Sequence, residues 1–241
     1  MRAAMIAVLA CLAHPALAED QATAFVEGNV LGSLYHELGH AMIDVLQLPV
    51  LGREEDAADA LAIVLAHNLW QEDQARSVAT ATALYYWYAS VGGEEPVSWG
   101  VHGTDEQRFY TTVCLFYGAD PDNRADFARE NELPEDRASG CADEFKLADE
   151  SWWGLLDDVV VEDGDPPGNS FVFKGGDGPI AELLAAEVET LNTWFKLPIT
   201  VPVELAECQE ANAFYDPELK VITICTEYVA FFEEQAAEEG L

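Results

Sequence analysis

Basic side chains are scarce in this chain. Its 241 residues include 11 lysines and arginines against 45 aspartates and glutamates, which gives a formal net charge of −34 at pH 7. Such a surface repels polyanions, so we exclude nucleic acids and anionic membrane surfaces as partners. The excess of acid is typical of a solvated acidic surface, and by itself it does not indicate binding of basic peptides.

Long apolar runs are also missing after the first residues, so we expect no membrane span. The start has the pattern of a secretory signal peptide, with Arg2 before an apolar run and Ala16-Leu17-Ala18 as an A-x-A cleavage site. A lipoprotein signal ending at Cys11 fits less well, because few residues precede that cysteine. We expect a signal peptide at 1–18 and an exported protein, periplasmic or secreted.

Cysteines are few, and none forms a C-x-x-C pair. Removal of the signal peptide leaves four, and an even number in an exported protein suggests disulfides. Three pairings are possible, of which we favour the pairs nearest in sequence, Cys114–Cys141 and Cys208–Cys225. A zinc site built from these cysteines is not favoured, because zinc-binding cysteines usually come in short-spaced pairs.

The pattern H-E-x-x-H stands at His36-Glu37-Leu38-Gly39-His40. On a helix, residues four apart share a face, so both imidazoles can reach one metal ion while the glutamate reaches a bound water. The residues around the motif are apolar, which indicates a buried helix. Because buried polar groups are costly unless they are satisfied, the motif predicts a Zn²⁺ site, with one ion per chain.

A third protein ligand is expected, because catalytic zinc sites use three and leave one position open. Glu55 and Asp59 follow four residues apart on the next predicted helix. We assign Glu55 as the third ligand and Asp59 as the acceptor of a hydrogen bond from a liganding histidine. Glu54 and Asp56 are alternative ligands. Acidic decoration of a helix N-terminus accounts for one or two of these acids, but less well for Asp59.

H-E-x-x-H followed by E-x-x-A-D is similar to the glutamate-type zinc peptidases. Residues 36–62 resemble more closely the bacterial metallopeptidase family grouped as domain of unknown function 4344. The same resemblance extends over residues 105–110, Cys114 with 117–121, and Cys208 through 212–216 to Cys225. It implies a zincin-like metallopeptidase domain without implying a known substrate.

The order of these segments departs from the family pattern. The segment that resembles 208–225 precedes the H-E-x-x-H helix in the family and follows it here, so the chain reads as a circular permutation. We expect one zincin-like domain over 19–241, with the permuted join near 162–178, where 162–168 is the strongest loop signal. The helical stretch expected at 227–239 should then end close to residue 25.

The hydrophobic periodicity predicts an α+β fold, mostly helical with a small sheet or hairpin. Residues 53–91 form one long or broken helix in this prediction, and a turn at 216–218 joins the last two strands. The other helices are expected at 25–46, 105–116, 144–160, 180–195 and 227–239, and the strands at 171–173, 199–205 and 219–226.

These observations favour a zinc-dependent peptidase acting on peptide or protein substrates, with Glu37 as general base. We assign the oxyanion-stabilising role to His102, with Tyr110 and Tyr215 as alternatives, although an exposed loop histidine explains His102 slightly better. Residues 221–225 could present an open strand edge to an extended peptide, or form an ordinary hairpin. A non-catalytic, zinc-stabilised binding module is the alternative function, and hydrolysis of a non-peptide amide is not separable by sequence.

Two arginines are expected to have structural roles. Arg108 is one of few basic residues in a very acidic chain, so we expect it to pair with a buried acid. We also expect Asp44 to pair with Arg53 and to fix the turn between the two metal-binding helices.

Overall fold

The computed structural model describes residues 15–92, 99–162 and 164–241, with side chains from residue 21 onward. Most of the predicted signal peptide therefore lies outside the described residues. The helices are α1 (Pro15–Leu46), α2 (Glu54–Leu69), α3 (Glu72–Val91), α4 (Asp105–Ala119), α5 (Ala125–Glu130), α6 (Glu135–Leu156), the 3₁₀ turn η1 (Asp157–Val159), α7 (Pro179–Trp194) and α8 (Thr226–Glu239). The strands are β1 (Phe171–Lys174), β2 (Val201–Ala206), β3 (Ala213–Asp216) and β4 (Val221–Cys225).

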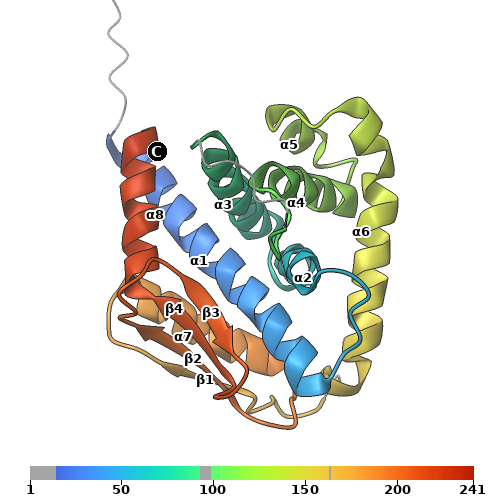
Figure 1. Ribbon diagram of the computed structural model, residues 1–241, viewed down its shortest axis with the longest axis vertical. Helices are drawn as coiled ribbons and strands as arrows, with labels where there is room; N and C mark the ends of the chain where they lie inside the picture. The colour runs from blue at the N-terminus through green and yellow to red at the C-terminus, as the bar shows by residue number, and fades with distance from the viewer. Residues whose placement is uncertain (1–14, 93–98, 163) are drawn as a thin grey trace, which may run out of the picture.

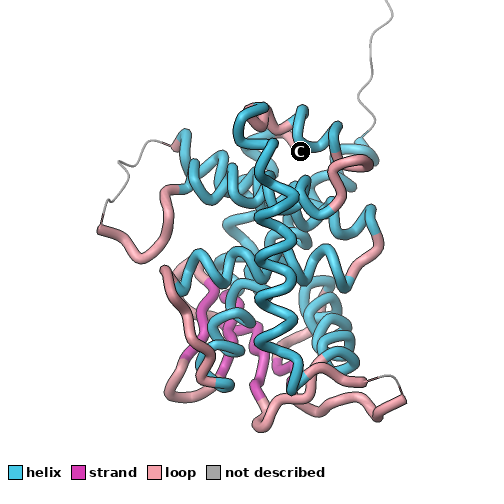
Figure 2. The backbone as a smooth tube through the Cα atoms, turned by 90° about the vertical axis from the view of Figure 1, so that its right-hand side faces the viewer, coloured by secondary structure: helices cyan, strands magenta, loops and turns pink. Residues whose placement is uncertain are grey.

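The architecture is a mostly helical α+β domain, as predicted. Figure 1 shows α1 crossing the molecule diagonally, with α8 on one side and α2 and α3 on the other. The strands gather at one end of the molecule, as the second view shows (Figure 2). The face of α1 that meets the other helices carries Leu34, Leu38 and Met42, which are fully buried. The metal-binding motif thus lies on the helix that forms the centre of the core.

The sheet has the strand order β1-β2-β4-β3. β1, β2 and β4 run parallel, and β3 pairs antiparallel with β4 as the outer strand. Two predictions are corrected here. The turn at 216–218 joins β3 to β4, not residues 199–205 to 219–226. In addition, 221–225 is not an open edge, because β4 pairs on both sides, and β3 is the edge strand on that side.

Local sequence explains where the helices around the motif begin and end. After α1, Gln47 takes a left-handed conformation with φ 54°, and Pro49 follows two residues later. α2 then starts at Glu54 and lies close against α1, because Gly39 faces Ala58. A Cβ atom added at Gly39 would come within 2.9 Å of the Ala58 Cα atom. This close approach brings the residues beside Ala58, namely Glu55 and Asp59, to the histidine face of α1.

Several predicted boundaries differ from the observed ones. The stretch 53–91, predicted as one long or broken helix, is broken into α2 and α3, because Trp70 and Gln71 are extended. α6 begins nine residues before the predicted helix at 144, α5 was not predicted, and α1 begins at Pro15 rather than at residue 25. The polar start of α6 hides its helical period, since its apolar residues come late.

Both favoured cysteine pairings are present as disulfides, Cys114–Cys141 between α4 and α6, and Cys208–Cys225 at the ends of the β3–β4 segment. Within the described part of the chain, no helix has the length and apolar character needed to cross a bilayer. α8 packs beside α1 and ends near its start (Figure 1). That proximity is what a permuted chain order requires, and the permutation itself stays a prediction.

Candidate metal centre

Three side-chain atoms from α1 and α2 converge on one point. His36 Nε2 lies 3.2 Å from Glu55 Oε2, His40 Nε2 lies 3.2 Å from the same oxygen, and the two nitrogens are 3.2 Å apart. His36 is only 9% exposed, and His40 and Glu55 are partly buried. The three residues therefore form a compact donor triangle that could hold a metal ion.

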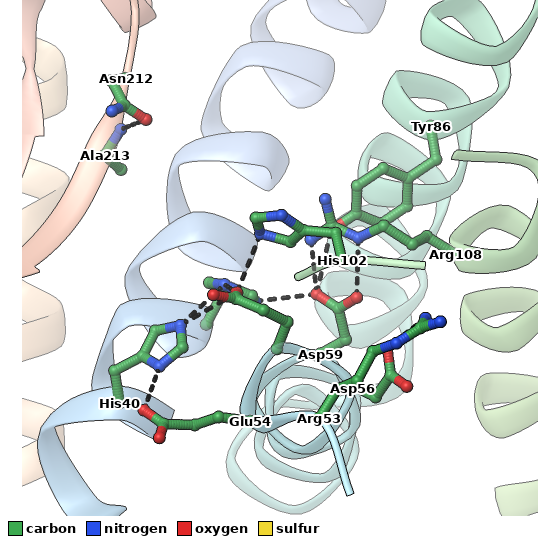
Figure 3. Close-up of polar contacts among 12 residues, drawn as sticks. His40, Arg53, Glu54, Asp56, Asp59, Tyr86, His102, Arg108, Asn212 and Ala213 are labelled. Atoms are coloured by element: carbon green, nitrogen blue, oxygen red, sulfur yellow. Dashed lines mark hydrogen bonds and ion pairs between the residues drawn. The ribbon is translucent and has the colours of Figure 1, made fainter. Parts of the chain in front are cut away.

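The other nitrogen of each imidazole is already engaged. His36 Nδ1 lies 2.8 Å from Asp59 Oδ1, and His40 Nδ1 lies 2.8 Å from Glu54 Oε1. Carboxylates accept hydrogen bonds, so each Nδ1 carries a proton, and with an ion bound each ring would be neutral and turn its Nε2 lone pair toward that ion. In that state the two Nε2 atoms and Glu55 Oε2 are three acceptors that face one another, and a cation between them would satisfy all three. Figure 3 shows His40 between Glu54 and this convergence point.

The spacing of the three donors fits a first-row divalent ion. Bonds of about 2.0–2.2 Å in a tetrahedral arrangement separate donor atoms by about 3.4 Å. The three observed distances of 3.2 Å are close to this value. The residues present thus fit the donor set of a His-His-Glu metal site.

The pKa of His36 reflects the same excess of acceptors. Burial lowers this pKa, but the hydrogen bonds with Asp59 and Glu55 outweigh burial and raise it to about 9. The surrounding carboxylates thus favour a positive charge at the position where a bound divalent cation would supply one.

Asp59 connects the histidine to a buried arginine. Arg108 donates from Nε to Asp59 Oδ2 at 2.8 Å and from Nη2 to Oδ1 at 2.7 Å, and Tyr86 donates to Oδ1 at 3.2 Å. Burial raises the pKa of Asp59, but the bonds with Arg108 and His36 outweigh it and hold the pKa well below its usual range. Figure 3 shows Arg108 above Asp59. The prediction that Arg108 pairs with a buried acid is confirmed.

Glu37 is 7% exposed and lines the cleft beside the histidines. Burial raises its pKa, which the charges of His36 and His40 and a backbone hydrogen bond from Tyr215 oppose without cancelling. The carboxyl is therefore a stronger base than an exposed glutamate. It is held between the motif helix and β3.

His102 stands in the loop before α4, with 45% of its side chain exposed. Its Nε2 lies 2.9 Å from Glu55 Oε2, and its ring stacks near that of His36 with centroids 6.3 Å apart. His102 thus contacts the carboxylate of the predicted ligand rather than standing free in the loop (Figure 3). Of the alternatives, Tyr215 also lines the cleft, whereas Tyr110 is not among its lining residues.

The hairpin of β3 and β4 is fastened to α1 next to the motif. Tyr215 donates its hydroxyl hydrogen to Asp44 Oδ2 at 2.6 Å, and Lys220 Nζ contacts the same oxygen. The predicted partner of Asp44 was Arg53, which instead lies 3.8 Å from Asp56 Oδ1. That prediction is wrong, because the hairpin brings a lysine to Asp44 from 176 residues away in sequence.

The donor triangle opens into a cleft of about 1030 Å³ that follows α1 from Asn29 to Gln47. One wall is formed by β3 and the residues before it, with Asn212, Ala213 and Phe214. The opposite wall comes from the start of α2, the middle of α3 and the loop with His102. The sequence did not reveal the β3 wall, because a strand of four residues gives almost no periodic signal.

A comparison with protein families supports a metal-dependent enzyme. Residues 9–156 and 180–241 match the family described as "Putative metallopeptidase" (DUF4344). No curated protein and no solved structure matches the chain. The unmatched residues 157–179 include the whole of the predicted join at 162–178. Since the match covers most of its length, the chain belongs to this metallopeptidase family.

Proposed function

We propose that the protein is a zinc-dependent peptidase in which His36, His40 and Glu55 hold the ion and Glu37 is the general base. One observation carries the proposal. Both Nδ1 atoms are bound to carboxylates, while the two Nε2 atoms and Glu55 Oε2 form a triangle with 3.2 Å sides. Of the common divalent ions, zinc prefers this number of nitrogen and oxygen donors.

Zinc bound there would lower the pKa of a coordinated water and polarise the carbonyl of the substrate. Glu37 would accept the water proton and pass it to the leaving amine, a role that suits a buried carboxyl with a raised pKa. Asp59 and Glu54 would fix the imidazole rings through their Nδ1 atoms. His102 is the candidate for stabilising negative charge on the reacting carbonyl, because its exposed ring reaches the donor triangle.

The position of β3 supports the proposal that the substrate is an extended peptide. It is the outer strand of the sheet, it lines the cleft, and its Tyr215 backbone reaches Glu37. An extended chain could pair with its free edge and present a bond to the donor triangle. The two disulfides are compatible with an exported protein, so we place this activity in the periplasm or outside the cell.

The test compares Glu37→Gln with wild type and with Glu27→Gln, the same change on α1 outside the cleft lining. Metal content and hydrolysis of unstructured casein and of a peptide library are measured together. We expect one ion per chain in all three proteins and a loss of hydrolysis of about 10²-fold or more in Glu37→Gln only.

Equal hydrolysis by Glu37→Gln and wild type would remove Glu37 from the mechanism. Metal-loaded wild type that cleaves neither substrate would favour the non-catalytic binding module instead. The structure does not favour that module, because a purely structural site has no use for an acid in the position of Glu37, at the wall of an open cleft.

A further inference from the structure

The cleft has two chemically different ends. Beyond the motif, its outer end is lined by charged and polar side chains that include Asp44, Arg53 and Glu54. Toward the start of α1, its inner end is lined by Asn29, Gly32 and Ser33, and this end extends about 10 Å from His36 at 1.5 Å per helical residue. The inner end therefore runs along α1 directly beside the donor triangle, where a substrate side chain could lie.

Apart from Arg108, the side chains that line the inner end are uncharged. α3 contributes Thr82, Tyr85 and Tyr86, and α8 contributes Tyr228. The nearest cation, Arg108, already makes two hydrogen bonds to Asp59 and lies over the Tyr86 ring at 4.1 Å. In a chain with 45 acidic residues, this stretch offers no free counter-ion among its lining residues.

Aromatic contacts close this end. Tyr85 of α3 packs against Tyr228 and Phe232 of α8, with ring centroids 6.2 and 5.5 Å apart. One helical turn before Asn29, Phe25 is 3% exposed and lies against Tyr88 and Phe232. The two helices that flank α1 in Figure 1 thus meet through these rings. Among the residues that the structure describes, these rings close the inner end, which we call the blind pocket.

We propose that this blind pocket, lined by Ser33, Thr82, Tyr85, Tyr86 and Tyr228, selects substrates with an uncharged, preferably aromatic, side chain next to the cleaved bond. This inference rests on the proposed peptidase function. A charged side chain would lose its water there without gaining a partner, which is costly. An aromatic ring would gain edge-to-face contacts with the tyrosines and bury apolar area.

The test uses small peptide hydroxamates, which bind the metal without requiring turnover. The variable side chain, Phe, Tyr, Asp or Lys, is placed next to the hydroxamate in each of the two chain directions. Binding to the zinc-loaded protein is measured by calorimetry. We expect one direction in which Phe and Tyr bind at least about tenfold more tightly than Asp and Lys, equal to about 1.4 kcal/mol.

Two variants assign this preference to the pocket. Ser33 is partly exposed on the cleft face of α1, so Ser33→Leu should fill the pocket and abolish the aromatic preference. Ser139→Leu makes the same change at an exposed position of α6, and this variant should keep the aromatic preference. If Ser33→Leu does not fold, Ser33→Val with unchanged circular dichroism replaces it, and a smaller reduction of the preference is expected because valine fills less of the pocket.

The outcomes separate the two levels of the proposal. Equal binding of all four hydroxamates, or a preference that Ser33→Leu leaves intact, overturns the pocket and leaves the peptidase proposal standing. Failure of every hydroxamate to bind the zinc-loaded protein contradicts the proposed function itself, and the pocket assignment falls with it.

Discussion

In the candidate metal centre, the carboxylate of Asp59 contacts three other side chains. It accepts from His36, Arg108 and Tyr86 while it remains almost fully buried. This position was predictable, because Glu55 and Asp59 are four residues apart and helical spacing places both on the histidine face. The contact of Glu54 with His40 was not predictable, since it depends on side-chain rotamers. The contact of Tyr215 with Glu37 was not predictable either, since it comes from a strand distant in sequence.

Replacement of Asp59 by Asn tests this connection. The amide keeps the shape of the side chain, but it removes the charge that balances Arg108 and weakens the hold on His36 Nδ1. We expect metal affinity to fall about 10–100-fold. The free energy of unfolding should fall by about 3 kcal/mol, because Arg108 stays buried without its partner. Competition with a metal chelator and urea unfolding measure the two effects.

The matched control is Asp56→Asn, since Asp56 lies on the same helix with 56% of its side chain exposed. This variant should behave as wild type in both measurements. An Asp59→Asn protein that binds metal as tightly as wild type would show that the bond to His36 has no part in holding the centre.

At the level of elements, helices with a regular apolar period were predictable, and the sheet was only partly so. The amphipathic stretch at 180–195 corresponds closely to α7, which has Leu184, Val188 and Leu191 on its buried side. Residues 199–205 and 219–226 are strands as predicted, but periodicity cannot tell whether two strands pair directly. They pair in parallel with each other, β3 pairs antiparallel with β4, and β3 and β4 pack against α1.

The disulfide Cys208–Cys225 closes the segment that carries the β3 wall, whereas Cys114–Cys141 joins α4 to α6. Changing either pair to serine should lower the free energy of unfolding by about 3 kcal/mol, as expected for loops of this length. Only the loss of Cys208–Cys225 should also weaken hydroxamate binding, because it loosens one wall of the cleft. Calorimetry at a temperature where both variants are folded checks this, and equal losses of binding in both variants would contradict it.

The contact between α1 and α7 contains a buried acid. Glu187 is 1% exposed, accepts a hydrogen bond from Tyr35 through Oε1, and has no partner for Oε2 among the described residues. Burial raises its pKa from 4.5 to about 7, which the bond from Tyr35 only partly offsets. The folded state therefore holds this proton more tightly than the unfolded state does.

Stability should respond to pH accordingly. The contribution of Glu187 is fully present below pH 4.5 and is lost as pH rises through about 7, by about 3 kcal/mol in all. Urea unfolding of wild type and Glu187→Gln between pH 5 and 8 measures it. The free energy of unfolding of Glu187→Gln, measured relative to that of wild type, should increase as pH rises. The exposed Glu189→Gln is the control, and a difference that is constant with pH would contradict the raised pKa.

For the whole molecule, the dominant property is charge. A formal charge of −34 makes the folded chain repel itself, and this property was readable from composition alone. Whether the domain is circularly permuted is a question at the same scale. α8 ends beside the start of α1, which permits the permuted order without requiring it (Figure 1).

Self-repulsion predicts stabilisation by salt. Raising sodium chloride from about 0.05 to about 1 M shortens the screening length about fourfold, so the melting temperature should rise by several degrees. Scanning calorimetry at constant pH measures this shift, with an uncharged solute of equal osmolality as the control. A melting temperature that stays constant or falls would show that the acidic residues are already balanced within the fold.

The central claim is tested most directly by locating the metal. Crystals of the zinc-loaded protein, measured on both sides of the zinc absorption edge, should give one anomalous peak within about 2.2 Å of His36 Nε2, His40 Nε2 and a Glu55 oxygen. A zinc-loaded crystal whose anomalous peak lies elsewhere, or whose peak is ligated by residues other than these three, would contradict the account.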